Sequence, residues 1–525
     1  MVLLGLMAVW SPPAPAEAKM VFHRGNASEP DTLDPHLASG TWENNIIGDL
    51  FLGLTTEDAA ARPIPGVAES WTTSADGLTW TFKLRKGMVW SDGVPIKASD
   101  VVFGFRRILD PKTAAKYASI LYIVKNAEEV NTGKLPVEAL GVRAIDAGTV
   151  EIQLAQPAPF LPGLLTHYTS FPLPEHVVVK HGKDWTKPGN MVSSGPYVLA
   201  EWSPHDKVKA VKNPRFYDAA NVAIDEVYYY PIEDERIALT RFRAGEIDGN
   251  FTNRGFPVDQ MEWLKANMPG QARITTYLAN EYIVVNTRRK PYDDPRVRRA
   301  LALAIDREIY ADKVYRDGRI PAYNFVPPGI DNYVAKPPQV DFVAMPMAQR
   351  KAEAKRLLAE AGFGPDNPLR FDYKHMTGFD PRRAAAALTA MWREVGIIAK
   401  PLPNEPKVHY NTIQEFDFDV AYAAWVGDYN DPQTFLYLME GNAGAFNYSG
   451  YNNLAYNALM AQAKQTLDLK ARAEIMARAE QVAMNDLATI PLTFPTSKVL
   501  VGTHVKGYVD NIMNWHRTRF MRIER

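Results

Sequence analysis

The sequence predicts an α/β protein built from two or three lobes. Helical and strand patterns alternate along the whole chain, which is the arrangement that an α/β fold requires. The chain has 525 residues, more than one ordinary hydrophobic core can serve, so we expect it to divide into lobes. Its 46% hydrophobic and 23% charged content is typical of a folded protein and excludes a disordered one.

The segment 69–105 contains the clearest succession of local signals. Apolar and polar residues alternate there, which predicts a strand with one buried face at Trp80, Phe82 and Leu84. Asp-Gly pairs at 76–77 and 92–93 predict a turn on either side of this strand. Ser99-Asp100 then precedes an apolar run, as the cap of a helix would.

Further elements follow from periodicity. A helix is expected to begin at Asp294 and Pro295, because apolar residues then recur on one helical face at Val297, Leu301, Ala304 and Ile305. A second helix is expected to end at Gly396, after the evenly spaced residues Ala385, Leu388, Trp392 and Val395. Val150, Ile152 and Leu154 alternate with polar residues and predict another half-buried strand.

The charge balance excludes two classes of partner. The formal net charge is -1, whereas binding to nucleic acid or to an anionic membrane requires clustered Lys and Arg. We therefore expect no nucleic-acid partner and no membrane-surface partner.

The first residues predict export from the cytoplasm. Residues 2–10 form a short apolar run, and Ala16-Glu17-Ala18 is a small-residue pattern where a signal peptidase could cut, so 1–18 is interpreted as a signal peptide. A buried N-terminal strand is the alternative. No later stretch approaches the roughly 18 apolar residues of a membrane span. The chain has no cysteine, which excludes disulfides, thiolate metal sites and a lipidated cysteine anchor. A free periplasmic protein fits best.

Several motifs, taken in order along the chain, resemble one family. Beside Trp71 and residues 90–93 of the segment described above, these motifs are SEPDTLDP at 28–35, SGPY at 194–197, RAGEID at 243–248, DPRVR at 294–298 and WVGDYNDP at 425–432. Together they resemble the oligopeptide, dipeptide and nickel-binding receptors of ABC transporters, the bacterial extracellular solute-binding proteins of family 5. The last motif resembles the oligopeptide-binding branch in particular.

This resemblance implies a type II periplasmic-binding-protein fold, with two main lobes and a small inserted α/β lobe. It implies a discontinuous first lobe made of residues 20–50, 165–285 and 495–525. The inserted lobe would be 51–164 and the second main lobe 286–494. Two chain crossings would then form a hinge, and ligand would bind in the cleft between the main lobes.

Motifs of catalysis are missing from the sequence. HExxH, GxSxG, GxxxxGK and GxGxxG do not occur, and Gly362-Phe363-Gly364 is interpreted as a helix stop. His176 and His181 lie five residues apart, a spacing that does not bring both rings to one helix face. We expect neither an enzyme nor a cofactor nor a bound metal. The nickel-binding relatives keep a metal or haem receptor as an alternative, and a periplasmic peptide hydrolase is a further one.

Asp428 is the candidate on which the predicted site centres. The family resemblance places a Trp, here Trp425, and an Asp three residues later at the amino end of the bound peptide. An ammonium group that leaves water for a closing cleft needs a fixed carboxylate to offset the desolvation. The alternative is that residues 427–432 form only a turn, whose polar side chains bond their own backbone. Both interpretations stay open at this point.

Other ligand-binding candidates come from the same resemblance. Trp425 and Tyr429 would flank the ligand with flat apolar surface, next to Gly427. Glu29 is a second possible acceptor for the amine. Tyr117 and Asn253 fall where family members contact the peptide.

One position departs from the family pattern. The best-known enteric relative has an arginine three residues before the Trp, which can meet the carboxylate of a short peptide, and here that place is Tyr422. The carboxylate would then be met by another group, with Arg382, Arg383, Lys374 and His375 as candidates, or by water. Alternatively, the ligand is a murein peptide or another modified amino compound.

The sequence therefore predicts a monomeric periplasmic receptor that binds oligopeptides between two lobes and delivers them to the permease subunits of an ABC importer. Protein backbone would pair with the extended peptide backbone, while ligand side chains enter roomy hydrated pockets.

Overall fold

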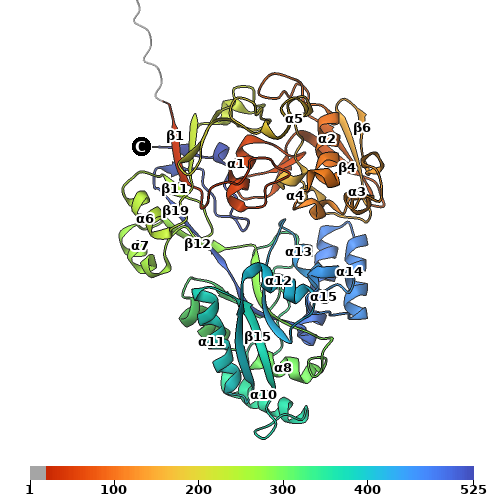
Figure 1. The fold of residues 1–525 in the computed structure, drawn as a ribbon, viewed down its shortest axis with the longest axis vertical. Helices are drawn as coiled ribbons and strands as arrows, with labels where there is room; N and C mark the ends of the chain where they lie inside the picture. Colours follow the sequence, from red (N-terminus) through yellow and green to blue (C-terminus); the bar gives the residue numbers. More distant parts are fainter. Residues whose placement is uncertain (1–18, 525) are drawn as a thin grey trace, which may run out of the picture.

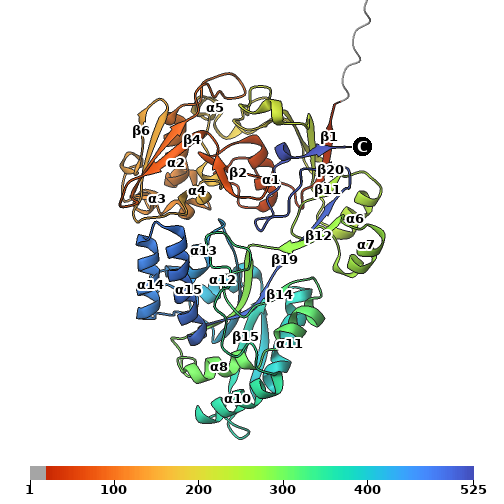
Figure 2. The same cartoon turned by 180° about the vertical axis from the view of Figure 1, so that it is seen from behind.

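The structure is a computed structural model that describes residues 19–524, so the expected signal peptide at 1–18 lies outside the described residues. It contains two large sheets in two main lobes, with helices packed on them and a smaller third lobe beside the first (Figures 1 and 2). The expected two-lobed α/β architecture with an additional small lobe is confirmed.

The first lobe is organised around a seven-stranded mixed sheet. Its strand order is β12-β19-β11-β1-β10-β9-β8, and β1 pairs in parallel with both β10 and β11. The strands are β1 (Val21–Gly25), β8 (Tyr197–Ser203), β9 (Lys207–Lys212), β10 (Glu226–Tyr230), β11 (Gly249–Asn250), β12 (Ala272–Thr276) and β19 (Thr496–Val501). Helices α1 (Thr41–Leu50), α5 (Glu175–His181), α6 (Glu235–Arg243) and α7 (Met261–Asn267) accompany this sheet.

The second main lobe contains a six-stranded sheet in the order β14-β18-β13-β17-β15-β16. Its strands are β13 (Ala279–Val285), β14 (Ile320–Pro321), β15 (Arg370–Met376), β16 (Ile398–Asn404), β17 (Val420–Val426) and β18 (Thr489–Phe494). The helices are α8 (Pro295–Leu303), α9 (Arg307–Ile309), α10 (Met347–Glu360), α11 (Phe379–Arg393), α12 (Pro406–Gln414), α13 (Gln433–Leu436), α14 (Leu454–Gln465) and α15 (Leu469–Asp486).

The inserted lobe shares its core with the first lobe. Its four-stranded antiparallel sheet has the order β4-β5-β7-β6, and one buried cluster joins Phe82 of this sheet to Phe22 of β1. The elements are β4 (Ala68–Thr73), β5 (Thr79–Leu84), β6 (Val142–Asp146), β7 (Thr149–Gln153), α2 (Ala98–Leu109), α3 (Ala127–Asn131) and α4 (Leu161–Leu164). The two lobes therefore pack as one body, since a continuous core resists relative movement. A short hairpin of β2 (Thr55–Glu57) and β3 (Pro63–Pro65) lies beside them.

The chain passes between the main sheets at two short crossings. One crossing is Tyr277-Leu278, between β12 and β13, and the other is Pro495, between β18 and β19. The Tyr277 N–H donates to the Pro495 carbonyl at 3.0 Å, so the crossings lie side by side. The family resemblance implies that the middle segment of the first lobe ends at residue 285. Strand β13 belongs to the second sheet, which favours an end at 277–278 instead. The limits of the lobes stay a prediction.

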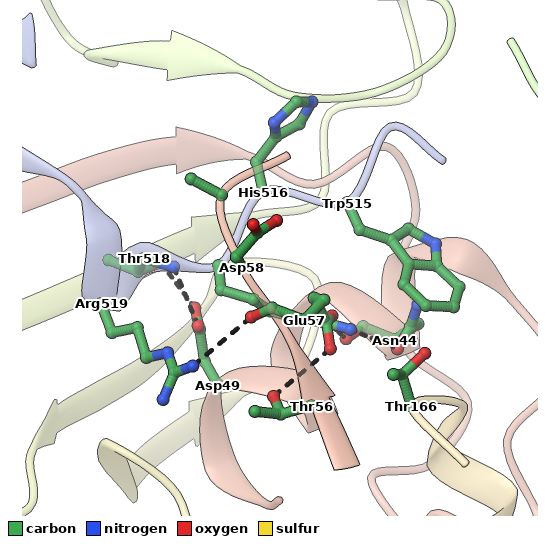
Figure 3. A network of polar contacts seen from close by, with 12 residues as sticks. Asn44, Asp49, Thr56, Glu57, Asp58, Thr166, Trp515, His516, Thr518 and Arg519 are labelled. Carbon is green, nitrogen blue, oxygen red and sulfur yellow. Dashed lines mark hydrogen bonds and ion pairs between the residues drawn. The ribbon is translucent and has the colours of Figure 1, made fainter. Parts of the chain in front are cut away.

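The C-terminal segment 511–524 is built into the first lobe. Asp49 of α1 accepts the Thr518 N–H at 2.9 Å, and Arg519 donates to the Glu57 carbonyl at 3.4 Å (Figure 3). Arg517 forms a buried ion pair with the Glu57 carboxylate. These contacts hold the neighbouring Trp515 in place.

Candidate functional site

A cleft of about 1300 Å³ separates the two main lobes. Asn253 and Lys498 line it from the first lobe, while Glu281, Arg319 and Tyr422 line it from the second. Because both sheets contribute to its walls, any rotation at the crossings changes the width of this cleft.

A smaller cavity of about 90 Å³ adjoins the cleft and contains Asp428. Tyr277 and Val426 line both spaces, so the cleft and the smaller cavity are adjacent. The walls of the smaller cavity come from all three lobes and include the rings of Tyr117, His167, Tyr168, Tyr277 and Trp515. We call this space the Asp428 cavity.

The loop that carries Asp428 is fixed by the turn after β17. The Gly427 N–H donates to the Leu278 carbonyl at 2.8 Å, and a Cβ at Gly427 would lie 2.6 Å from the Leu278 side chain, so a larger residue would force that side chain to move. Asp431 receives two hydrogen bonds from Arg472, at 2.7 and 2.8 Å, and both side chains are 2% exposed. Asp431 thus has a structural role, and Asp428 is held next to it.

Burial determines the electrostatics of Asp428. Its side chain keeps partial access to solvent through the cavity, yet protein surrounds the carboxylate, and the lost hydration raises its pKa to about 7. The Tyr117 hydroxyl donates to it at 3.4 Å, which acts in the opposite direction. The Asp428 charge in turn raises the pKa of Tyr117, so this hydroxyl keeps its proton. Within residues 19–524, no cationic side chain pairs with Asp428.

The two predicted aromatic partners pack within the protein. Tyr429 stacks on Phe160 of the inserted lobe, with ring centroids 5.0 Å apart, and is 8% exposed. Trp425 packs edge-on against Tyr437 and Phe446 and donates to Thr434 at 3.3 Å. Neither ring lines the two spaces described above. The aromatic walls come instead from Tyr168, Tyr277 and Trp515, which no local sequence pattern indicates.

The remaining candidates separate into two groups. Asn253 and Tyr422 line the large cleft, and Tyr117 lines the Asp428 cavity. Glu29 accepts from Trp202 Nε1 at 2.8 Å and from the His205 N–H at 3.2 Å, outside both spaces. Because its carboxylate is engaged within the first lobe, our proposed site omits Glu29.

Three of the four candidates for the peptide carboxylate already have partners within the protein, although Arg383 also lines the large cleft. Lys374 pairs with Asp417, Arg383 donates to Asp380 at 3.0 Å, and the ring of His375 bonds the Met376 carbonyl. Arg382 is exposed and lines neither space.

The described residues lack two features that define other classes of protein. Across residues 19–524, no three His, Cys, Asp or Glu side chains gather in a way that could hold a metal ion. In the same part of the chain, no helix combines the length and the apolar character needed to cross a membrane.

Two lobes joined by paired crossings, with a ligand-sized cleft between them, define a receptor of the type II periplasmic-binding-protein class. The chain belongs to the bacterial extracellular solute-binding proteins, family 5: the model of the middle region of that family matches residues 62–447. The resemblance seen in the sequence motifs is thereby confirmed.

Individual relatives agree with this assignment. The chain is 37% identical to the periplasmic oligopeptide-binding protein OppA of Escherichia coli (strain K12), over 93% of this chain and 90% of the relative. Among solved structures, the unliganded open form of the murein tripeptide-binding protein MppA has a TM-score of 0.86 at 35% identity, covering 97% of this chain and 98% of that one. Haemophilus influenzae OppA in complex with the peptide RPPGFSPFR has a TM-score of 0.78 at 34% identity, covering 97% and 100%. These relatives are named as binding proteins.

Proposed function

We propose that this protein is the periplasmic receptor of an ABC importer, which captures oligopeptides in its interlobe cleft and delivers them to the membrane permease. The observation that carries the proposal is the Asp428 carboxylate, which is shielded from water and paired with no cation in residues 19–524. A free peptide has an ammonium group at its amino end. This ammonium supplies the missing charge, since a desolvated carboxylate is stabilised by an opposite charge at hydrogen-bonding distance.

We propose that the peptide occupies both spaces. The amino end enters the Asp428 cavity, where aromatic rings surround the cation and contribute attraction through their faces. The rest of the peptide lies in the 1300 Å³ cleft, which has room for varied side chains and for water. Affinity for many sequences follows, because the charged end is common to all free peptides.

A murein peptide is the second candidate ligand, and the similarity to MppA favours it. It also has a free amine, so the function of Asp428 is the same for both ligands. We propose that the chain acts by binding alone, with transport energy supplied by the ATPase subunits of the importer.

Blocking the peptide amine tests the proposal directly. An N-acetylated tetrapeptide is expected to bind at least about a hundred-fold more weakly than the free tetrapeptide, because acetylation removes the ammonium and leaves Asp428 desolvated without a partner. Isothermal titration calorimetry of both peptides measures this ratio. Equal affinities would defeat the proposed function, and cleavage products in the mass spectrum of the mixture would show an enzyme instead.

Peptide binding is also expected to depend on pH in a defined direction. Without ligand, the Asp428 carboxyl keeps its proton up to a pKa of about 7, and it must release that proton to pair with an ammonium. Affinity therefore falls as pH drops below 7, approaching about ten-fold per unit. It also falls above roughly pH 8, where the peptide amine loses its proton. Calorimetry from pH 5.5 to 9 should give a maximum between pH 7 and 8, whereas a constant affinity on the acid side would contradict this assignment.

A further inference from the structure

Lys498 lies on β19, three residues after the Pro495 crossing, at the edge of the large cleft. Its backbone is held on two sides. The Lys498 N–H donates to the Asn253 carbonyl at 3.2 Å, its carbonyl accepts the Gly255 N–H at 2.6 Å, and it lies opposite Ile274 in the sheet. The origin of the side chain is therefore fixed within the first lobe.

The Lys498 side chain is buried, and its charge has no dedicated partner among the described residues. The residue is only 6% exposed and lines the cleft. In the part of the chain from 19 to 524, no hydrogen bond or ion pair engages its ammonium group. This differs from most buried charges, which are paired.

The acids around Lys498 already accept hydrogen bonds from arginines. Asp317 accepts two hydrogen bonds from Arg319, at 2.9 and 2.8 Å, and Glu235 accepts one from Arg254 at 2.7 Å. Burial lowers the pKa of Lys498, only partly offset by these acids, so its charged form lacks a dedicated partner. A desolvated ammonium of this kind is stabilised when a ligand brings a carboxylate to it.

We propose that Lys498 receives a carboxylate of the bound peptide, which is either its main-chain carboxyl terminus or an acidic side chain. This inference rests on the proposed function and adds the second anchor of the ligand. Two other cations that line the cleft are already paired with acids. Arg319 already donates to Asp317 and Glu281, and Arg236 pairs with Asp259 at 2.7 Å in an exposed position.

The two anchors lie on different lobes and have opposite charges. Asp428 belongs to the loop after β17 in the second lobe, and Lys498 belongs to β19 in the first. A ligand with an ammonium and a carboxylate then links the lobes through both groups and favours the closed cleft. An amidated peptide without acidic side chains would lack one of the two links, so Lys498 makes the site selective for peptides that bring a carboxylate to it.

The experiment measures, by calorimetry, the affinities of matched peptides for matched protein variants. The first arm tests the carboxyl terminus and compares tetraalanine as the free acid with its carboxyl-terminal amide. The second arm tests an acidic side chain and compares amidated tetrapeptides that have Glu at the second, third or fourth position with the same peptides that have Gln there. The variants are Lys498→Met, Lys498→Arg and the control Arg236→Met, which removes the same charge from an exposed, paired position in the same cleft.

In one of the two arms, wild-type protein is expected to bind the peptide with the carboxylate on the order of thirty-fold more tightly than its neutral counterpart. The arm that shows this preference identifies the source of the carboxylate. Lys498→Met should abolish that preference while binding the neutral peptides as wild type does. Lys498→Arg should retain much of the preference, and Arg236→Met all of it.

Two results would overturn the inference. One is a Lys498→Met protein that keeps the wild-type preference in both arms; the other is a wild-type protein with no preference in either. A purely structural lysine would lower the melting temperature when replaced and leave peptide preference unchanged. If wild type binds none of the peptides, the proposed function fails as well, whereas binding without selectivity removes only the assignment of Lys498.

Discussion

The Asp428→Asn variant is expected to bind a free tetrapeptide several hundred-fold more weakly than wild type, or more. Asparagine keeps the shape of the side chain and can still accept from Tyr117, but it lacks the charge that offsets the buried ammonium. Removing one partner of a buried ion pair costs about 3–5 kcal/mol, which corresponds to this loss of affinity. Calorimetry at pH 7.5 measures the change.

Two controls separate lost recognition from lost structure. The unliganded Asp428→Asn protein should melt no lower than wild type, because the substitution removes a desolvated carboxylate that has no cationic partner in residues 19–524. Asp312→Asn, in an exposed position on the large cleft, should leave affinity unchanged. N-acetyl peptide should bind wild type and Asp428→Asn about equally. A several hundred-fold difference that persists with the acetylated peptide would point to a distorted loop instead.

The Arg472→Met variant is expected to show the largest loss of stability. Arg472 and Asp431 are both 2% exposed and share two hydrogen bonds, so methionine leaves the Asp431 carboxylate buried without its cation. The free energy of unfolding should fall by about 3–5 kcal/mol. Urea denaturation of the unliganded protein measures this change, and peptide affinity should fall with it because Asp431 anchors the loop that carries Asp428.

The double variant Arg472→Met/Asp431→Asn is the matched comparison. Asparagine removes the stranded charge, so the double variant should recover a large part of the stability that Arg472→Met loses. If both proteins are as stable as wild type, the ion pair does not hold the loop.

Local structure could be predicted from the sequence where one residue pattern determines it. Trp80, Phe82 and Leu84 are buried on β5 as their alternation indicated. Asp294 accepts the Arg296 N–H at 2.8 Å and begins α8, with Pro295 as its first residue. Gly362 and Gly396 follow the ends of α10 and α11 with φ of +89° and +91°, values that glycine adopts readily.

The sequence pattern places the start of helix α2 slightly too late. Helix α2 begins at Ala98, and the Asp100 carboxylate accepts the Lys97 N–H at 2.9 Å from the third helical position. Asp100 thus forms the return bond of a capping box, where the sequence suggested the cap itself. The two arrangements share the same residues, so the pattern alone could not separate them.

The site could be predicted only in part, because its walls come from distant segments. Asp428 lies in a cavity between lobes, and its contact with peptide stays a prediction. Trp425 and Tyr429 flank it in sequence, but the turn directs both rings into packing contacts. Tyr277 and Lys498 reach the site through sheet pairing and the two crossings, and Trp515 reaches it through the C-terminal segment. Local periodicity in the sequence does not predict these positions, because they depend on which strands pair in the sheets.

The C-terminal segment also determines when the molecule can be completed during synthesis. Arg24, next to the end of β1, donates to the His516 carbonyl at 3.0 Å, and β11 pairs with β19. Strand β11 therefore waits for β19, one of the last strands that the ribosome makes, and contacts this distant in sequence slow the search for the native state. The second lobe lies entirely between those partners and can assemble earlier. The emerging polypeptide accordingly stays unfinished, with unpaired strand edges, until its final residues are released.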